Sequence, residues 1–412
     1  MKQNNVLIIG GGASGLAAAI VAGQMGARVT LLDRNDRVGK KLLATGNGRC
    51  NLANTGEAAY FGDPNFARAV LQSMPVAEVL AFFERIGLPV RADASGRVYP
   101  ACNQAAAVLD VLRAQLDSLG VRVITQAEAR ALQPLGGGWR VLSSQGEFTA
   151  DQVIVCCGGL AAPKLGAANA YRLLTALGCE LIPAAPALSP LETEKAPLKG
   201  LSGLRLPAIL TLCGDGVPAA RTVGEVLFAD YGVSGVCAMQ LARDAWHLLN
   251  DHKKVMLYID FSPALGLGDY VMGRQTPAAP GENRAEIAAW LARRREALPG
   301  DPLLGALPRL LREKLQKAPQ ADLPGLLCAY PLAVTGVRGF DQAQVTQGGI
   351  AASVFDPATL EHKRLPGLHA CGEMLNVDGD CGGFNLQFAF ATGLLAGRHA
   401  ARAGHSSPRS AL

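Results

Sequence analysis

Residues 5–33, NVLIIGGGASGLAAAIVAGQMGARVTLLD, decide the fold. The apolar run at 6–9 predicts a buried strand. Glycines at 10, 12 and 15 then open a helix that is expected to reach about Gly26. A second apolar run at 29–32 predicts another buried strand and ends at Asp33. This order of strand, glycine turn, helix and strand predicts the first βαβ unit of an α/β domain.

The spacing Gly10-x-Gly12-x-x-Gly15 is typical of dinucleotide binding. Gly10 permits the tight strand-to-helix turn, Gly12 lets the backbone approach a pyrophosphate at the helix N-terminus, and Gly15 lets helix and strand pack closely. Asp33 follows Gly10 by 23 positions, where a carboxylate accepts hydrogen bonds from an adenosine ribose. An acid there favours a 2′-hydroxyl over a 2′-phosphate, so the predicted ligand is FAD or NAD rather than NADP.

The same stretch has a competing interpretation as a membrane segment. Residues 6–27 carry no charge, so hydropathy alone indicates a transmembrane helix or a signal segment. Six glycines in those 22 residues, and the lack of an A-x-A-like cleavage site, argue against both interpretations. No other apolar run is long enough to span a bilayer, so we expect a soluble cytoplasmic protein without a membrane partner.

Composition sets broad limits on the protein. A length of 412 residues predicts two or three domains, and 48 glycines suit an α/β protein with many tight turns. The net charge of +5 is not typical of a dedicated nucleic-acid binder but does not exclude RNA. Ten cysteines without a C-x-x-C motif indicate free thiols in a reducing compartment. Six scattered histidines, none at ligand spacing with a cysteine, predict no metal site.

A basic, glycine-punctuated loop is expected at 34–54. Between positions 34 and 49 it holds one acid, Asp36, against five cationic residues, which are Arg34, Arg37, Lys40, Lys41 and Arg49. Backbone amides and guanidinium groups of this kind suit a segment laid along phosphates or along the carbonyl edge of a flavin. A solvated surface loop fits the composition equally well.

The next hundred residues continue as many FAD-binding domains do. Helical spacing predicts two helices over 64–87, divided by Pro75, and a third helix over 105–119. A strand at 121–124, a small antiparallel meander at 130–149 and an apolar strand at 151–157 follow. A meander between two core strands favours FAD, because a plain NAD domain continues with alternating strands and helices.

Three prolines within 183–190 mark a domain boundary. Short alternating strands then predict a β-rich domain over about 191–262, and 265–283 is expected to be a flexible loop. The helical stretch 284–317 carries eight basic residues and four acids, a local charge of +4. That excess suits a face for RNA or an acidic partner, although a merely solvated face is the simpler explanation.

A second glycine-rich segment precedes the last predicted helix. A short strand ends at Gly372-Glu373, and residues 378–387, DGDCGGFNLQ, lead into a helix over about 388–401. A glycine loop at a helix N-terminus predicts a second site for an anion or an oxidised ring. We therefore expect both chain ends to build one nucleotide-binding domain, followed by a disordered tail from about Gly404.

With these motifs in place, the chain resembles a known family, the BaiN-like FAD-dependent oxidoreductases, also described as aminoacetone-oxidase-like flavoproteins. The resemblance rests on GGGASGLAAA at 10–19, GKKLLATGNGRCNLAN at 39–54, CGGLAAPKLG at 157–166, GEVLFADYGVSG at 224–235, VTGVRGFDQAQVTQGGI at 334–350 and CGEMLNVDGDCGGFNLQFAFATGLLAG at 371–397. These motifs span essentially the whole chain. Two departures are small: Asp33 stands where glutamate is usual, and Phe384 where tyrosine is common.

The resemblance implies an α/β fold with a Rossmann-type FAD-binding domain built from 1–190 and 345–412. It implies a β-barrel-like insert at 191–262 and 325–344 and a helical insert at 263–324. The pyrophosphate is expected on the first glycine loop, the flavin near Lys41 and 45–51, and the ribitol at 372–373. The full set of implied FAD-binding residues is Gly10, Gly12, Ala13, Ser14, Gly15, Asp33, Arg34, Lys41, Thr45, Gly46, Asn47, Arg49, Cys50, Asn51, Gly158, Gly372, Glu373, Gly382, Gly383, Asn385, Leu386 and Gln387.

The implied activity is reduction of a conjugated ring C=C bond by hydride that passes through the flavin N5. The resemblance offers two substrate classes: 3-oxo steroid or bile-acid intermediates, and a uridine of ribosomal RNA that becomes dihydrouridine. NAD(P)H is the expected transient electron donor, and ribosomal RNA would contact the basic 284–317 stretch. An FAD-dependent amine oxidase that uses O2, and a non-catalytic flavin-binding protein, are the alternatives.

Cys50 and Arg338 are the candidate catalytic residues. A cysteine near the flavin N5 can donate a proton, but a small polarisable filler is the simpler role for Cys50 and more so for Cys381. Arg338 can polarise a substrate carbonyl, but a structural ion pair is the simpler role. His369 is predicted to be a core histidine beside the C-terminal strand.

Overall fold

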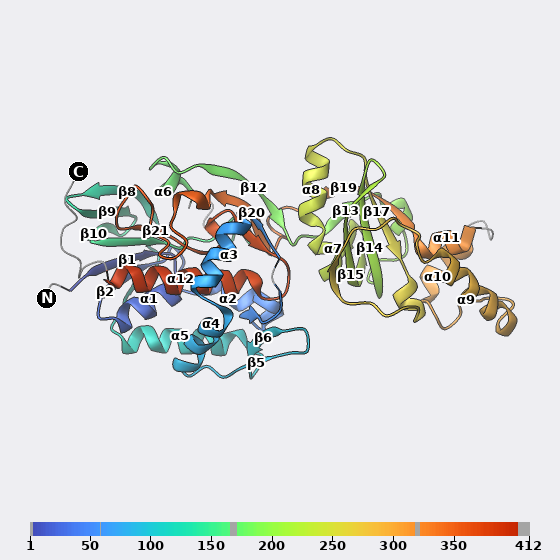
Figure 1. Cartoon of the computed structure of the whole chain (residues 1–412), viewed down its shortest axis with the longest axis horizontal. Helices are drawn as coiled ribbons and strands as arrows, with labels where there is room; N and C mark the ends of the chain where they lie inside the picture. Colours follow the sequence, from blue (N-terminus) through green and yellow to red (C-terminus); the bar gives the residue numbers. More distant parts are fainter. Residues whose placement is uncertain (1–2, 58, 165–170, 318–321, 403–412) are drawn as a thin grey trace. The chain divides into compact units, whose positions relative to one another are not determined.

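The computed structural model describes residues 3–57, 59–164, 171–317 and 322–402. The chain divides into two compact units, which are coloured along the sequence in Figure 1. Unit 1 comprises Met1–Ala185 and Val345–Leu412, and unit 2 comprises Pro186–Gln344. The predicted tail from about Gly404 lies outside the described residues, as does part of the motif at 157–166.

A five-stranded parallel sheet forms the centre of unit 1. Its order is β21-β11-β1-β2-β7. The strands are β1 (Asn5–Ile9), β2 (Arg28–Leu32), β7 (Arg122–Ile124), β11 (Gln152–Val155) and β21 (Leu368–Ala370). The apolar β1 lies in the middle of the sheet, where both of its faces are buried. Because β21 comes from the far end of the chain, the structure confirms a Rossmann-type domain built from both chain ends.

Two helices on one face of this sheet pack unusually close together. They are α1 (Ala13–Gln24) and α12 (Phe384–Arg402), which lie side by side in Figure 1. A Cβ atom on Gly393 would lie 2.2 Å from the carbonyl oxygen of Ser14, and one on Gly397 would lie 2.5 Å from that of Ala18. The two helices therefore touch backbone to backbone, which only glycine permits at these positions.

The remaining elements of unit 1 confirm most of the sequence-based expectations. Pro75 separates two helices, and the antiparallel meander is present. The predicted loop at 34–54 differs, because Lys-Lys-Leu-Leu-Ala after Gly39 forms a short helix. The elements are α2 (Lys40–Ala44), η1 (Thr45–Gly48), α3 (Pro64–Ser73), α4 (Val76–Arg85), α5 (Ala105–Ser118), α6 (Tyr171–Thr175), η5 (Ala352–Val354), η6 (Gly372–Met374), β3 (Ala53–Asn54), β4 (Tyr60–Gly62), β5 (Val90–Ala92), β6 (Arg97–Pro100), β8 (Ala129–Leu135), β9 (Gly138–Ser143), β10 (Gly146–Ala150), β12 (Leu181–Ala187), β20 (Val345–Ile350) and β22 (Val377–Gly379).

Unit 2 contains a closed antiparallel β-barrel. Strands pair in the order β14-β17-β19-β13-β16-β15, and β15 pairs back with β14 to close the ring. Closure gives each of these strands a partner on both sides, although β16 covers only the 227–229 part of β15. Their bounds are β13 (Leu191–Thr193), β14 (Arg205–Gly214), β15 (Val217–Ala229), β16 (Gly232–Ser234), β17 (Val255–Asp260) and β19 (Tyr330–Val337). The predicted β-barrel-like subdomain is thus confirmed as a fold.

The helices of unit 2 were only partly expected. The predicted helical stretch forms α9 (Arg284–Ala297) and α10 (Arg309–Gln316), followed by α11 (Leu323–Cys328). The stretch read as β-rich also contains η2 (Ala196–Leu198), α7 (Val236–Gln240) and α8 (Ala242–Asn250), and η3 (Ser262–Leu265) follows it.

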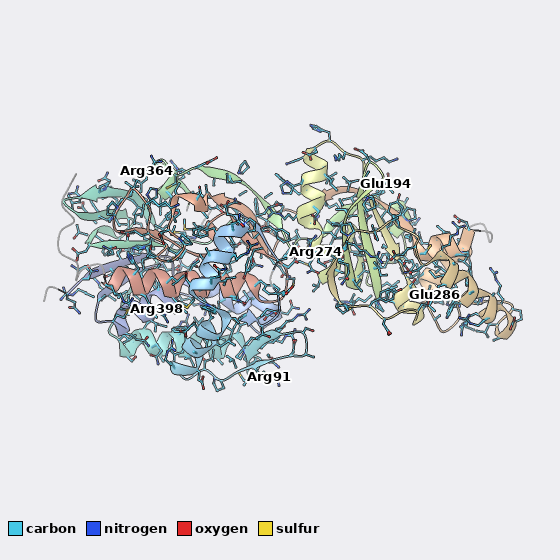
Figure 2. All side chains as sticks on the ribbon, viewed as in Figure 1. Arg91, Glu194, Arg274, Glu286, Arg364 and Arg398 are labelled. Carbon is cyan, nitrogen blue, oxygen red and sulfur yellow. The ribbon has the colours of Figure 1, made fainter. Side chains whose placement is uncertain are left out.

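The predicted flexible loop at 265–283 instead contributes a strand, β18 (Gly273–Gln275), which pairs with β15. Arg274, labelled in Figure 2, holds it by donating to the carbonyl of Gln240 at 2.7 Å and to Asp244 at 3.0 Å.

Within the described part of the chain, no single helix has the length and apolar character needed to cross a bilayer. One consecutive pair, α3 and α4, meets those criteria jointly but bends by 50° at the break. The uncharged stretch at 6–27 that raised the membrane interpretation forms β1 and α1, both largely buried in the core of unit 1.

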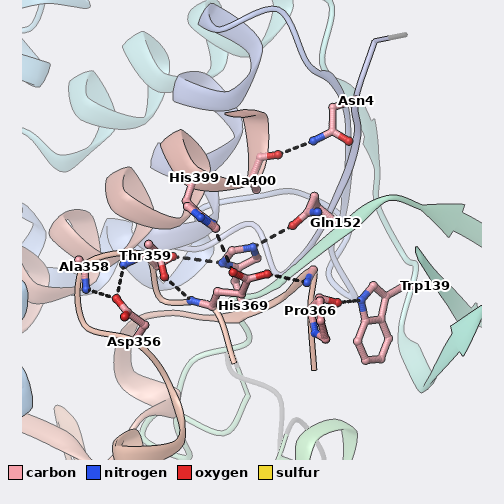
Figure 3. Close-up of polar contacts among 12 residues, drawn as sticks. Asn4, Trp139, Gln152, Asp356, Ala358, Thr359, Pro366, His369, His399 and Ala400 are labelled. Atoms are coloured by element: carbon pink, nitrogen blue, oxygen red, sulfur yellow. Dashed lines mark hydrogen bonds and ion pairs between the residues drawn. The ribbon is translucent and has the colours of Figure 1, made fainter. Parts of the chain in front are cut away.

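His369 lies buried in β21, as predicted for a core histidine. Its Nδ1 is 3.2 Å from the carbonyl oxygen of Thr359, and its Nε2 is 3.1 Å from the side-chain amide of Gln152 (Figure 3). Burial, with a smaller contribution from nearby His399, lowers the pKa of His369 to about 3. The imidazole is therefore neutral at neutral pH.

This depressed pKa predicts a loss of stability in acid. Between the unfolded pKa of 6.5 and the folded value of about 3, the unfolded chain binds a proton at His369 that the folded chain does not. The free energy of unfolding should therefore fall as the pH drops through this window. We expect His369→Gln to show a weaker decline of the thermal midpoint from pH 7 to about 4 than the wild type or the exposed control His252→Gln. An unchanged pH dependence would contradict the assignment.

The contact between α1 and α12 gives a second prediction. Gly397→Ala raises helix propensity, yet its Cβ must displace the backbone of Ala18, and overpacking of this kind costs about 1–3 kcal/mol. We expect a lower midpoint of thermal unfolding. The control is Gly300→Ala, where a Cβ meets nothing within 4 Å. If Gly397→Ala is as stable as that control, the close packing is refuted.

Candidate cofactor-binding site

The first glycine turn has the geometry that its sequence predicts. Gly10 has a φ of +104°, and a Cβ atom there would lie 2.4 Å from the carbonyl oxygen of Cys156. A Cβ atom on Gly15 would lie 1.9 Å from the carbonyl oxygen of Gly10. At Gly12, by contrast, a Cβ atom would meet nothing within 4 Å, and no described side chain caps α1. The first turn of α1, which includes Ala13 and Ser14, thus lacks a side-chain cap and begins beside open space at Gly12, an arrangement suited to an anion.

Asp33 is fixed at the end of β2, directly beside this turn. Its Oδ2 accepts the N–H of Gly11 at 2.7 Å, and its Oδ1 accepts the backbone and side-chain N–H groups of Asn35 at 2.7 and 3.0 Å. A carboxylate offers about four acceptor positions, so one position is left for a further donor such as a ribose hydroxyl. The contacts to Gly11 and Asn35 set the orientation of the carboxylate before any ligand binds.

A charged network joins four distant segments of unit 1. Lys41 Nζ lies 2.6 Å from Glu373 Oε2, and Glu373 Oε1 accepts the N–H of Thr346 at 3.0 Å. The hydroxyl oxygen of Thr346, fully buried, accepts the N–H groups of Leu160 and Ala161 at 2.8 and 2.9 Å. Sequence reasoning named Lys41 and Glu373 but missed Thr346, because an uncharged threonine in a buried strand carries no signal of a polar role.

The loop at 45–51 places one candidate catalytic residue in the core. Cys50 is fully buried, and burial raises the pKa of its thiol to about 11, although a hydrogen bond with Thr45 acts in the opposite direction. The thiol is therefore protonated and inaccessible to solvent, and its catalytic role remains a prediction. Gly46, Asn47 and Cys50 all have positive φ, with values of +57°, +54° and +58°. These three residues thus give the loop a tight backbone shape.

The other polar residues of this region mostly hold backbone in place. Arg34 donates to the carbonyl of Pro163 at 3.2 Å, and Thr45 donates to that of Leu42 at 2.6 Å. The Arg49 guanidinium lies 5.1 Å from the centre of the Tyr99 ring. These contacts favour a structural role for Arg34, Thr45 and Arg49, and their predicted contacts with FAD stay predictions.

The C-terminal glycine segment differs from expectation in one respect. α12 begins at Phe384, so Asn385, Leu386 and Gln387 occupy its first turn rather than the preceding loop. Asn385 donates to the carbonyl of Gly379 and accepts its N–H, both at 2.8 Å, and Gln387 Oε1 accepts the N–H of Asn54 at 3.0 Å. These amides tie the helix to neighbouring backbone, and their predicted contact with the isoalloxazine is untested.

Close backbone packing explains several glycines of the site. Gly372 and Gly383 have positive φ, and a Cβ atom would lie 2.8 Å from Ser14 Oγ in the first case and 2.3 Å from the carbonyl of Ala53 in the second. Gly158 and Gly382 also have positive φ. All four lie in unit 1.

Arg338 belongs to unit 2 and forms the ion pair that was the simpler expectation. Its Nη1 lies 3.1 Å from Glu192 Oε1, and its guanidinium lies 4.8 Å from the centre of the Tyr231 ring. A role in polarising a substrate carbonyl remains a prediction. Among the residues that the structure describes, no group of three or more His, Cys, Asp or Glu side chains is placed to hold a metal ion.

Two buried polar atoms of unit 1 point to a missing ligand. The side-chain Oδ1 of Asn51 and the hydroxyl of Tyr171 have no hydrogen-bond partner among the described residues. Burial and the charge of Glu373 raise the pKa of Tyr171, so its hydroxyl stays protonated. Unpaired buried groups are costly unless a ligand satisfies them. Together with the uncapped α1 and the open space at Gly12, they fit a polar nucleotide cofactor.

The protein-family model described as the HI0933-like protein Rossmann domain matches residues 4–399 of the chain. The chain belongs to this family. The chain is similar to 3-dehydro-bile acid delta(4,6)-reductase of Clostridium scindens, with 37% identity over 97% of this chain and 99% of that protein. Ribosomal RNA dihydrouridine synthase of Escherichia coli is 26% identical over 95% of this chain and 96% of its own length.

A solved structure supports the fold of the HI0933-like chain. The open conformation of a flavocytochrome c3 fumarate reductase matches with a TM-score of 0.50 at 14% identity, covering 97% of this chain and 78% of that one. The family match confirms the predicted BaiN-like resemblance and the Rossmann-type fold. It also supports an FAD-dependent oxidoreductase, in agreement with the fit of the site to a nucleotide cofactor.

The buried hydroxyl of Thr346 yields a prediction for this site. Thr346→Ala leaves the N–H groups of Leu160 and Ala161 without an acceptor, at a cost of about 1–3 kcal/mol for each buried group. We expect a lower thermal midpoint and faster loss of FAD on dilution. Thr346→Ser keeps the hydroxyl and serves as the matched control. Equal behaviour of the two variants would show that the hydroxyl does not support the loop.

Proposed function

We propose that this protein is an FAD-dependent ene-reductase that uses NAD(P)H to reduce a conjugated ring C=C bond of a 3-oxo steroid or bile-acid-type enone. One observation carries the proposal: a relative named as a bile-acid delta(4,6)-reductase is 37% identical along essentially the full length of both chains. The site in unit 1 agrees with the cofactor that this chemistry needs. Hydride addition to the β-carbon of an enone, with a proton added at the α-carbon, gives the saturated ketone.

FAD, when bound, supplies hydride transfer, and the chain supplies binding and orientation. The first turn of α1 would hold the pyrophosphate, and Asp33 would accept a ribose hydroxyl. The ammonium of Lys41 is held by Glu373 and stays a fixed cation near the loop after β11. Tyr171 keeps its proton in the interior and can donate a hydrogen bond there.

A second candidate substrate is a uridine of ribosomal RNA. Two relatives named as ribosomal RNA dihydrouridine synthases, from Escherichia coli and Haemophilus influenzae, are 26% and 25% identical over most of the chain. The C5=C6 bond of uracil is conjugated with a ring carbonyl, so the same hydride addition applies. Such a base must be single-stranded or flipped out of a helix before it is reduced.

Anaerobic reduction of the bound flavin tests the enzyme class. We expect NADH or NADPH to bleach the visible absorbance of the FAD-loaded protein, because an ene-reductase must take hydride from a donor. The bleached protein should recover its absorbance when a 3-oxo-4-ene or 4,6-diene steroid is added without oxygen. The control is a saturated 3-oxo steroid, which offers no C=C bond and should leave the protein bleached.

Other results of that experiment would replace the proposal. Recovery with a uridine-containing ribosomal RNA fragment, but not with the steroid, would assign the RNA substrate. Recovery only with O2 after reduction by an amine would indicate the oxidase alternative. A flavin that no donor bleaches would indicate a non-catalytic flavin-binding protein.

A further inference from the structure

One face of a small sheet in unit 1 carries two arginines beside an aromatic ring. The sheet has the order β3-β6-β5, and Arg91 of β5 lies opposite Tyr99 of β6. Arg97 precedes Tyr99 by two positions in β6. Directly opposed residues of antiparallel strands point to the same face, and so do residues two apart in one strand. Arg91, labelled in Figure 2, therefore shares one face with Arg97 and Tyr99.

Two glycine-rich segments adjoin these side chains. Arg49, in the loop at 45–51, places its guanidinium 5.1 Å from the centre of the Tyr99 ring. In the C-terminal segment, a Cβ atom on Gly382 would lie 3.9 Å from Arg97 Nε. The resemblance implies flavin-binding residues in both segments, and all of these residues belong to unit 1. The name arginine cluster is used below for Arg49, Arg91 and Arg97.

The arginine cluster carries positive charge that no ion pair neutralises within the described part of the chain. Arg49 and Arg91 are exposed, and Arg97 is half-buried. The carboxylate of Asp93, on the same hairpin, is held by its own turn, where Oδ1 accepts two backbone N–H groups at 2.9 and 3.0 Å. Asp380, in the C-terminal segment, is buried. The three guanidinium groups therefore repel one another, and a bound anion would remove that repulsion.

The proposed reductase needs a site for a second nucleotide, its electron donor. The sequence contains one Gly-x-Gly-x-x-Gly motif, at 10–15, and FAD would occupy that turn. The phosphates of the electron donor therefore need other positive groups, and guanidinium groups bind phosphate oxygens in pairs. Nucleotide sites that accept a 2′-phosphate place arginine beside it, whereas sites for a 2′-hydroxyl use an acid. A group of arginines without an available acid matches the phosphorylated form.

We propose that the arginine cluster binds the 2′-phosphate end of NADPH. This inference rests on the proposed function and names NADPH, rather than NADH, as its electron donor. A phosphate monoester carries a charge of about −1.5 to −2 at neutral pH, so it offsets more of the charge of the cluster than a singly charged phosphodiester of RNA does. The cluster recognises the adenosine end of the nucleotide and not the ring that carries the hydride.

Calorimetric titration of the full-length, FAD-loaded protein tests the arginine cluster. The probes are adenosine 2′,5′-bisphosphate and 5′-AMP, which differ only in the 2′-phosphate. The test variant is Arg91→Gln/Arg97→Gln, which leaves Arg49 intact because its loop is expected to line the flavin. The matched control is Arg28→Gln/Arg122→Gln, an exposed pair at the amino ends of β2 and β7 with the same charge change. Flavin content and thermal midpoint show that both variants are loaded and folded.

We expect the wild type to bind the bisphosphate about tenfold more tightly than 5′-AMP, because each hydrogen bond to a charged group contributes about that factor. The test variant should bind the bisphosphate about tenfold more weakly than the control variant and lose most of the preference. Arg97→Lys, which keeps the charge but not the planar fork, should fall between the two. If the double variant loses its flavin, the exposed single change Arg91→Gln replaces it, with Arg28→Gln as its control.

Equal affinities of the test and control variants for the bisphosphate would overturn the inference, as would a wild type that does not prefer it to 5′-AMP. Weaker binding of a single-stranded oligoribonucleotide to the test variant, with binding of the bisphosphate unchanged, would assign the cluster to RNA instead.

Flavin bleaching separates this inference from the proposed activity. A flavin that NADH and NADPH bleach at equal rates when each is below saturation would support the reductase and reject the arginine cluster as a 2′-phosphate site. A protein that binds the bisphosphate through these arginines, yet is bleached by neither nucleotide, would refute the activity and leave the binding site in place.

Discussion

The backbone contact between α1 and α12 is the constraint on which the rest of unit 1 depends. Gly393 and Gly397 bring the last helix against the first, with no side chain between them. That contact sets the C-terminal segment beside the first glycine turn, so that Gly372 lies against Ser14. Residues more than three hundred and fifty positions apart thereby form one site. A nucleotide cofactor held by both segments would in turn stabilise the association of the two chain ends.

An ion pair also links the two chain ends within unit 1. The ion pair of Lys41 and Glu373 joins α2 to η6, and Thr346 connects it to the loop after β11. Both charged side chains are mostly shielded from solvent, with exposures of 28% and 20%, so screening by salt is weaker than at an open surface. The network therefore acts as a rigid support for the loop residues rather than as a mobile surface pair.

Much of the fold follows from local sequence signals. The period of apolar residues defines β1, α1 and β2, and Pro75 divides α3 from α4, because these features depend on neighbours in the chain. The elements that sequence reasoning missed depend on distant partners. β18 exists because β15 offers it a pairing edge and because Gln240 and Asp244 hold Arg274, and all of these partners lie outside residues 265–283. At the site, glycines and charged residues were recognisable, whereas Thr346 acts through N–H groups nearly two hundred positions away.

Strand pairing in the barrel also brings the two ends of unit 2 together. Its first strand, β13, and its last, β19, are paired neighbours, with Leu191 opposite Val337. The two ends of the insertion thus emerge next to each other. An insertion of this kind can be exchanged, enlarged or trimmed with little disturbance of the domain that receives it. Evolution can in this way remodel unit 2 across such a family, while the nucleotide-binding domain that receives it is inherited unchanged.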